Sequence, residues 1–301
     1  DSEALETDAQ ELAEAFTHYL RACREDETAL STLPPGRFLM PGDLEGSPAL
    51  TFSPLDVDLH SKAKAGSLHK MMEDRFEAYK NVVVRPFFRE HFARLDRQIV
   101  LVDALQAINA GPEALADLEH ALSDILRCFK TGSNNWISSI FSKRIDRILF
   151  AATKADHLHH ENHDRMEKLL KSLVEKAVDR AKYSGAKVDV VALAAIRATK
   201  EAIIKESGEN YPVILGTPIK GEKIEQQLFD GTKETAVFPG DLPDNPASLF
   251  DHNTDNDPPV DLRFVRFRPP ELETNQQGLT LSLPHIRLDR ALEFLLGDQL
   301  A

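Results

Sequence analysis

The residues best suited to chemistry are Thr153-Lys-Ala-Asp156. They directly follow the apolar run Arg147-Ile-Leu-Phe-Ala-Ala. An apolar run without alternation is typical of a strand buried on both faces of a parallel sheet. Open α/β sheets bind ligands at the carboxyl ends of such strands. A carboxylate there can accept two hydrogen bonds from the Watson–Crick edge of guanine. A lysine stem can lie along the purine ring while its ammonium stays in water.

The spacing Thr-Lys-x-Asp is also how many GTPases read guanine. The alternative is a strand-to-helix turn in which Asp156 caps a helix beginning near Leu158. A second buried-strand run, 188–193, ends in Leu193-Ala-Ala-Ile-Arg197 and resembles the Ser-Ala-Lys loop of GTPases. Its small residues would let backbone N–H groups approach the guanine oxygen, or would simply pack beneath a helix. The predicted nucleotide contacts are Thr153, Lys154, Asp156, Ala194, Ala195 and Ile196.

The elements around these motifs predict a strand–helix–strand order. Residues 158–183 carry apolar positions at helical spacing between the two strands. A further strand at 97–103 and a helix at 113–129 precede them, so three parallel strands are expected side by side. The predicted fold class is α/β, the second half of a doubly wound parallel-sheet P-loop fold resembling a G domain. It carries a helical insertion layer and a small C-terminal α+β extension, with segments 1–94, 95–205 and 206–301.

The flanking segments carry further structural patterns. Helices are predicted at 8–24 and 68–92, and Pro86 should kink or split the second one. Residues 33–43 are predicted as loop, because their prolines and glycines exclude a long helix. Residues 48–58 are predicted as extended chain with Leu50, Phe52 and Leu55. Later segments predict strands at 212–218, 235–239 and 260–268, an exposed loop at 241–259 and a closing helix at 286–300.

The bulk composition excludes several classes of protein. The chain has 36 basic and 49 acidic residues and a formal net charge of −13, which argues against a general nucleic-acid surface. No apolar run reaches the roughly 20 residues of a membrane span, so an integral membrane protein is not expected. Only two cysteines occur, which fits a reducing, cytoplasmic compartment. The chain begins at Asp1 without methionine, as a processed product or an excised segment would.

Four runs together resemble the bacterial YcjX-like family of predicted P-loop NTPases: 34–43, 92–103, 149–157 and 283–289. The family is associated with stress responses. The resemblance implies a phosphate-binding loop, an Asp-x-x-Gly switch, a helical insertion and a base-recognition half, in that order. It implies binding of GTP or GDP, with Lys154 and Asp156 matching the base-specificity motif. A protein partner in envelope stress would accord with it.

One part of the family pattern is missing from this sequence. There is no G-x-x-x-x-G-K-[ST] loop; the nearest string, Gly216 to Lys223, lacks the closing pair, a helix after it and a buried strand of normal length before it. Asp43-Leu-Glu-Gly46 matches Asp-x-x-Gly by its letters only. Phosphate clamping and Mg²⁺ positioning supply most of phosphoryl-transfer catalysis, so this chain should be a poor NTPase or none. The strand at 98–102 should then present an open apolar edge, which a missing N-terminal half of the G domain would cover; otherwise the chain should be marginally soluble.

Histidines gather just after the predicted guanine motif. His159 and His163 are four residues apart and would share a helix face, which suits a metal pair. The favoured alternative is a solvated first helical turn with acids at the helix dipole. A zinc titration would distinguish these alternatives. The cluster consists of His157, His159, His160, Glu161, His163 and Asp164.

Other candidates have simpler explanations. Asp103 ends a buried strand and either caps a turn or touches a metal or switch residue. Trp136 is expected in the core rather than stacked on a base. The arginines at 263, 266 and 268 alternate on one predicted strand face, either solvated or facing an acidic partner. His285 and Arg287 lie in a family-like run without an assigned role.

Two functions remain open at this point. The first is a guanine-nucleotide-binding, stress-associated NTPase that hydrolyses GTP, and needs Mg²⁺, only when its phosphate loop is present. The second is a non-catalytic interaction or adaptor module on the same scaffold. An ATPase is a variant of the first, because Lys-x-Asp does not bar adenine in every fold. The sequence assigns no catalytic residue.

Overall fold

The computed structural model describes residues 2–25, 39–58, 60–91, 95–128, 145–183, 186–206, 208–245, 248–249, 262–270, 275–278 and 283–300. The predictions for 33–38, Trp136 and 251–261 lie outside these residues. The chain divides into two compact units, which are described separately. The first comprises Asp1–Leu95 with Thr131–Lys143, and the second comprises Asp96–Lys130 with Arg144–Ala301.

Helices dominate the described part of the first unit. Helix α1 spans Glu6–Glu25 and α3 spans Leu68–Tyr79, and a π-helical segment, Lys80–Val84, leads from α3 into α4, Arg85–Glu90. Pro86 lies in the first turn of α4. A proline there lacks an N–H and crowds the preceding turn. The hydrogen-bond pattern changes from π-helical to α-helical at Arg85, and the backbone stays right-handed helical across this boundary. A 3-10 turn at Pro48–Leu50 replaces the start of the predicted extended chain, and another, Gly42–Leu44, lies at the end of the predicted loop. The buried core of this unit comprises Ala9, Leu20, Phe52, Leu68 and Met72.

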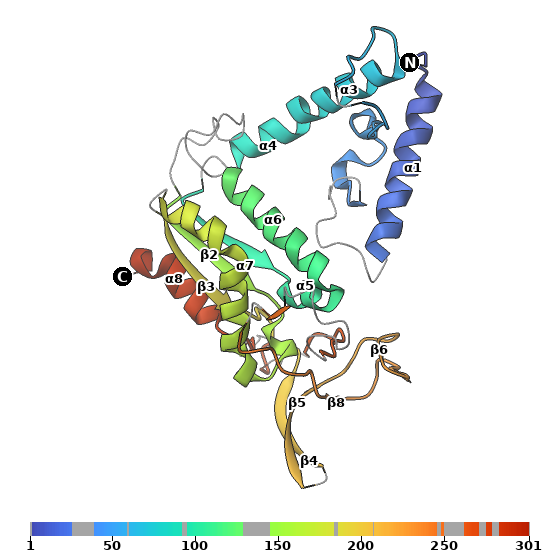
Figure 1. Cartoon of the computed structure of the whole chain (residues 1–301). Coiled ribbons are helices and arrows are strands. Elements are labelled where there is room, and N and C mark those ends of the chain that lie inside the picture. The colour runs from blue at the N-terminus through green and yellow to red at the C-terminus, as the bar shows by residue number, and fades with distance from the viewer. Residues whose placement is uncertain are drawn as a thin grey trace. The chain divides into compact units, whose positions relative to one another are not determined.

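A three-stranded parallel sheet forms the centre of the second unit (Figure 1). Its strands are β1 (Arg97–Val102), β2 (Arg147–Ala152) and β3 (Lys187–Ala192), and they lie in that order. Register aligns Arg97 with Arg147 and Arg147 with Lys187. Helices α5 (Ala104–Ala110), α6 (Pro112–Cys128) and α7 (His163–Tyr183) connect the strands. The predicted α/β arrangement of three consecutive parallel strands is confirmed.

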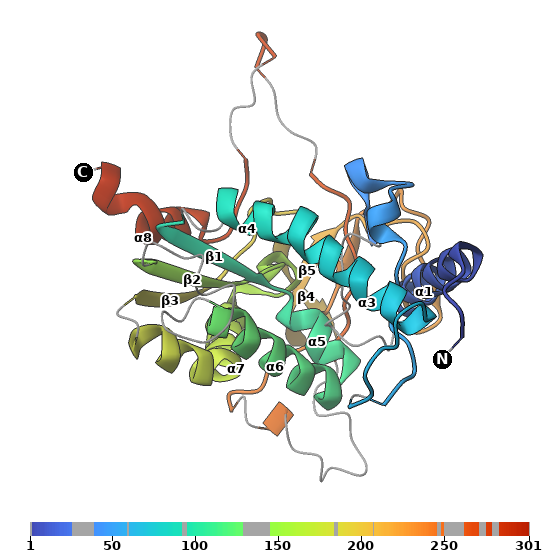
Figure 2. The same cartoon turned by 90° about the horizontal axis from the view of Figure 1, so that it is seen from above.

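Strand β2 is buried on both faces, as its apolar sequence predicts. Ile148, Phe150 and Ala152 pack with α5, α6 and α7 in the main core. Leu149 and Ala151 pack instead against helix α8, Leu288–Leu300. Figure 2 shows α8 on one side of the sheet and α6 and α7 on the other. Full burial of a side chain such as Phe150 contributes about 1.5–3 kcal/mol.

Strand β1 is an outer strand of this sheet. Among the described strands it pairs with β2 only. Val100 and Val102 face the main core. On the opposite face Leu101 is 63% exposed, and Ile99 is exposed as well. The predicted open apolar edge is therefore present in the described part of the chain.

A second sheet follows β3 and is antiparallel. It joins β4 (Lys200–Glu206), β5 (Glu209–Gly216) and β8 (Thr235–Val237), and the short strands Lys223–Ile224 (β6) and Gln227–Leu228 (β7) pair nearby. The predicted strands at 212–218 and 235–239 are confirmed. Strand β4 is not among the predicted elements, because Lys-Glu-Ala-Ile-Ile-Lys-Glu contains good helix formers. Pairing with β5 and a turn at Gly208, with φ of 90°, override that preference.

Three sequence predictions are corrected in this unit. The predicted exposed loop at 241–259 includes Leu242 and Leu249, which are buried in the main core. The predicted strand at 260–268 is, in its described part, a single bridge between Phe267 and Pro218. Helix α7 begins at His163 rather than near Leu158, because two 3-10 turns, Ala155–His157 and His160–Asn162, come first. No helix among the described residues is long and apolar enough to cross a bilayer.

Candidate functional site

The loop after β2 begins with Thr153 and Lys154. The Thr153 N–H and Oγ1 both donate to the Val102 carbonyl, at 2.9 and 3.2 Å, which ties the loop to the end of β1. Lys154 has a left-handed backbone, with φ of 62°, and its half-exposed ammonium lies 2.5 Å from Asp103 Oδ2. Asp103 Oδ1 also accepts the Gln106 N–H at 3.2 Å and caps α5. The capping alternative for Asp103 is confirmed, and its other oxygen holds Lys154.

Asp156 joins the loop after β2 to the loop after β3. Its side chain is buried, with the residue 4% exposed, and its Oδ2 accepts the Ala198 N–H at 2.8 Å. Its backbone carbonyl accepts the Thr199 hydroxyl. The neighbouring Ala155 N–H donates to the Leu193 carbonyl at 3.2 Å. Asp156 therefore does not cap α7, which begins seven residues later at His163.

The loop after β3 is fixed at both of its ends. Ala194 forms an antiparallel bridge with Ile286, and the Arg197 N–H donates to the Pro284 carbonyl at 2.7 Å. Between these points Ala195 and Ile196 are exposed. Among the described residues, no backbone hydrogen bond is made by the N–H groups of these two. The loop thus presents two uncommitted donors between fixed neighbours, beside the buried Asp156.

The family-like run at 283–289 supports this loop. Arg287 has φ of 53° and reaches α7, where it pairs with Asp164 at 2.7 Å and with Glu167. Glu167 Oε1 also accepts the Ala192 N–H at 2.9 Å, at the end of β3. Sequence reasoning left Arg287 without a role and did not identify Glu167. Their separation of 120 residues gives no local signal, and only the resemblance of the run marked it.

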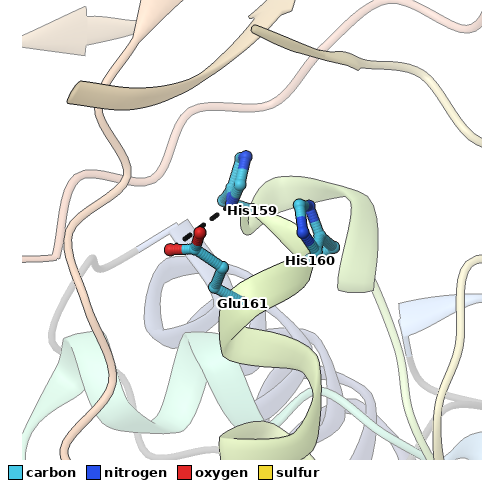
Figure 3. Close-up of side chains that lie close together, drawn as sticks. All are labelled: His159, His160 and Glu161. Atoms are coloured by element: carbon cyan, nitrogen blue, oxygen red, sulfur yellow. Dashed lines mark ion pairs between the residues drawn. The ribbon is translucent and has the colours of Figure 1, made fainter. Parts of the chain in front are cut away.

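Neither prediction for the histidine cluster holds. The favoured solvated helical turn is wrong for His159 and His163, because each is 4% exposed. His163 begins α7, and its Nε2 lies 2.9 Å from the Ala155 carbonyl, while burial lowers its pKa. His159 precedes α7, so the predicted His159–His163 helix face is wrong. His159, His160 and Glu161 instead lie together (Figure 3). His157 packs edge-on against Phe267, with ring centroids 5.4 Å apart, and burial lowers its pKa too.

The remaining candidates are accounted for by local contacts. The predicted solvated arginines have protein partners: Arg263 pairs with Glu225 and Arg266 with Glu222, and Arg268 donates to the Gly231 carbonyl. The Gly216–Lys223 string runs from the end of β5 into β6, so no helix follows it, although β5 is longer than expected. The Asp43-Leu-Glu-Gly46 string overlaps the 3-10 turn Gly42–Leu44 in the first unit, and no strand precedes it among the described residues.

The loops that follow β2 and β3 form the rim of the sheet at its carboxyl end. The hydrogen-bond donors and acceptors of this rim can be compared with those of a guanine base. One Asp156 oxygen is engaged by Ala198, and a carboxylate has lone pairs for further bonds. The left-handed turn at Lys154 and the two N–H groups at Ala195 and Ile196 lie on the flanking loops. The two loops thus bring the sequence-predicted acceptor and donors to the same end of the sheet. No phosphate-binding loop motif occurs in the sequence, so they provide no phosphate clamp.

Comparison with known proteins identifies the family of this chain. The model of the YcjX-like family, DUF463, matches residues 1–300. A protein named Ras-like GTPase YcjX from Escherichia coli (strain K12) is 39% identical over 297 residues, which cover 96% of this chain and 59% of that protein. A protein of the same name from Shewanella oneidensis is 33% identical over 274 residues, covering 88% of this chain and 53% of that protein. The chain thus spans little more than half the length of these relatives. On the family match and these identities, the chain belongs to the YcjX-like family.

Proposed function

We propose that this chain is the base-recognition half of a guanine-nucleotide-binding P-loop NTPase. The main support for this proposal is the hydrogen bond from the Ala198 N–H to Asp156, which brings together the loops that follow β2 and β3. The names of the relatives support the same function, because both are called Ras-like GTPases. GTP hydrolysis, Mg²⁺ binding, a cytoplasmic location and a stress-associated role belong to this proposal.

Each rim residue has a role in the proposal. The Asp156 carboxylate accepts from the guanine N1 and N2 donors while Oδ2 keeps its bond to Ala198. The Lys154 stem lies along the ring, with its position fixed by Asp103. Backbone N–H groups of Ala195 and Ile196 donate to the guanine oxygen. Thr153 and Ala194 hold the two loops at the ends of the strands.

The test uses a longer form of the protein that also contains the segment present in its longer relatives. GDP and ADP are titrated calorimetrically against the unmodified protein and Asp156→Asn. Asparagine keeps an oxygen for the Ala198 N–H, so the loops stay joined, but it loses the charge and one acceptor. We expect the preference for GDP to fall by at least about tenfold, which is about 1.4 kcal/mol.

Asp189→Asn is the matched control, because Asp189 lies in β3, before the strand's carboxyl end. It should leave the preference unchanged. Equal binding of GDP and ADP by the unmodified protein, or no effect of Asp156→Asn, would contradict the guanine site. Preference for ADP would favour the ATPase variant.

We also propose that a strand from the additional segment of the longer relatives pairs beside β1 in a protein of their length. Exposure of Leu101 and Ile99 on an outer strand supports this arrangement. An exposed apolar edge promotes self-association until it is covered. Leu101→Glu should reduce self-association of the isolated chain in sedimentation velocity. Ile203→Glu, at a residue 66% exposed on β4, is the control and should reduce it less.

The adaptor function has one observation in its favour. The first unit holds an apolar pocket of about 420 Å³, lined by Phe52, Leu55, Met72, Phe76 and Tyr79 among others. A pocket of this kind suits an apolar group of a partner. Failure of the completed protein to bind either nucleotide would favour this second function over the first.

A further inference from the structure

We propose that His159, His160 and Glu161 bind a divalent transition-metal ion, with Zn²⁺ the best match. One potential ligand atom from each residue lies within 4.8 Å of the other two. Figure 3 shows the Glu161 carboxylate turned toward the His159 ring, with the His160 ring beside it. The site uses none of the residues of the proposed guanine site.

The strongest indication is the unsatisfied nitrogen of His159. The residue is 4% exposed, and its Nδ1 is buried without a hydrogen-bond partner among the residues that the structure describes. Buried polar atoms nearly always have a partner, so an exception needs a physical explanation. A metal ion accepts the lone pair of a neutral imidazole and would supply the missing interaction.

The position of Glu161 suits an ion between the two side chains. Its Oε2 lies 3.9 Å from His159 Nδ1, which is too far for a hydrogen bond. Zinc bonds to nitrogen and carboxylate oxygen are about 2.0–2.2 Å long, so two ligands of one ion are at most roughly 4.2 Å apart. The separation of the His159–Glu161 pair falls within that limit. The set of three residues is held within 4.8 Å, so the exposed side chains would close by several tenths of an ångström on binding the ion.

The His160 ring is oriented by a carboxylate. Its Nδ1 lies 2.6 Å from Glu201 Oε2, and Glu201 Oε1 accepts from Arg197 at 2.9 Å. Metal-binding histidines commonly use one ring nitrogen for the ion and give the other to a carboxylate. The His159 and His160 rings lie with centroids 4.2 Å apart. Glu201 is therefore a positioning residue for His160.

The donor set selects the class of metal. Two imidazoles and one carboxylate suit Zn²⁺ and similar first-row ions, whereas Mg²⁺ and Ca²⁺ prefer oxygen ligands. His160 and Glu161 are exposed, so a fourth position is accessible to water or to an external ligand. Zinc sites with three protein ligands and an open position are a known type.

The test is a calorimetric titration of chelator-treated protein with ZnCl₂, followed by Co²⁺ absorption spectroscopy. One equivalent should bind, and the Co²⁺ spectrum should report four-coordinate ligation. Glu161→Gln and His160→Ala alter exposed side chains and should leave the fold intact. Each should weaken binding at least about tenfold, and Glu201→Gln should weaken it by about 10- to 100-fold through loss of ring orientation.

His285→Ala is the matched control, because His285 is an exposed histidine outside the cluster. It should bind Zn²⁺ as the unmodified protein does. Absence of stoichiometric binding, or binding that survives both Glu161→Gln and His160→Ala, would overturn the proposal. Asp156→Asn should retain the metal, so loss of the guanine site and loss of the metal site are separate outcomes.

Discussion

Asp156 and His159 are two buried polar residues of the same loop with opposite surroundings. Each is 4% exposed, and only three positions separate them. Asp156 has a protein partner, because its Oδ2 accepts the Ala198 N–H at 2.8 Å. The Nδ1 of His159 has no such partner among the described residues. Burial alone therefore does not identify a binding residue; the partners of its polar atoms must be counted.

The two side chains also differ in how many partners they can bind. A carboxylate can accept several hydrogen bonds, so Asp156 can hold Ala198 and still accept from a base. A neutral imidazole has a single lone pair, so His159 Nδ1 can serve only one partner. The guanine site is thus proposed at a residue that already has a structural role. The metal site is proposed at a nitrogen for which no structural role is seen in the described chain.

The largest expected effect is the loss of the Asp156 carboxylate. Asp156→Ala leaves the Ala198 N–H without its acceptor, which should lower the free energy of unfolding by about 1–3 kcal/mol. Asp156→Asn keeps an oxygen and should cost clearly less. Urea unfolding of both variants measures the difference. Equal losses would show that the hydrogen bond from Ala198 does not stabilise the fold. Asp156 would then no longer differ from His159 in having a stabilising protein partner.

A second pair of variants tests whether the buried Nδ1 of His159 lacks a hydrogen bond. His163→Leu removes the bond to the Ala155 carbonyl and should cost about 1–3 kcal/mol. His159→Leu should cost less in metal-free protein, because its Nδ1 has no hydrogen bond to lose among the described residues. Both residues are 4% exposed, so the apolar replacement is matched in burial. Urea unfolding in the presence of a chelator is the measurement, and a larger loss at His159 would contradict the assignment.

The sequence predicts the parallel sheet well for a physical reason. The strands β1, β2 and β3 carry their own apolar patterns, and helical crossover connections make consecutive parallel strands neighbours. The ends of these strands then place Thr153 and Asp156 near Ala194 without knowledge of any contact. The prediction of both rim loops rests on local patterns of this kind.

The remaining features depend on contacts that local patterns do not encode. The Asp156–Ala198 bond joins residues 42 positions apart, and the Arg287–Glu167 pair joins residues 120 positions apart. The helical preference of 200–206 conceals β4, which forms only because β5 pairs with it. The apolar periodicity places the start of α7 too early. It therefore puts His159 on a helix face with His163, whereas the His159 ring lies beside that of His160.

A third prediction concerns the support of the rim loop from a distance. Arg287 fixes the run that bridges Ala194 through Ile286, without lying in the proposed guanine site. Arg287→Ala should weaken GDP binding by about three- to tenfold, roughly 0.7–1.4 kcal/mol. Arg290→Ala is the control, because Arg290 also contacts Glu167 but belongs to α8. Equal weakening by both would assign the effect to Glu167 rather than to the loop.

The smallest expected effect is the pH dependence of the Asp164–Arg287 pair. The hydrogen bond from Arg287, and then its charge, lower the pKa of Asp164 below its ordinary value; burial opposes them, and His163 and Lys168 add to the lowering. A lowered folded-state pKa means that the unfolded chain binds the proton more readily. The pair therefore stabilises the fold above the ordinary aspartate pKa, and this contribution is lost as the pH falls through the folded-state pKa.

Asp164→Asn tests this contribution without a change of shape. The variant should be slightly less stable than the unmodified protein at about pH 6, and the difference should be smaller at about pH 3, because the unfolded chain then binds the proton more readily than the folded chain does. The Asp164 side chain is well exposed, so the difference should be small and should shrink further in high salt. Urea unfolding at the two pH values is the measurement. A difference that persists at the lower pH would mean that the introduced asparagine disturbs the start of α7, beside His163, rather than removing a charge.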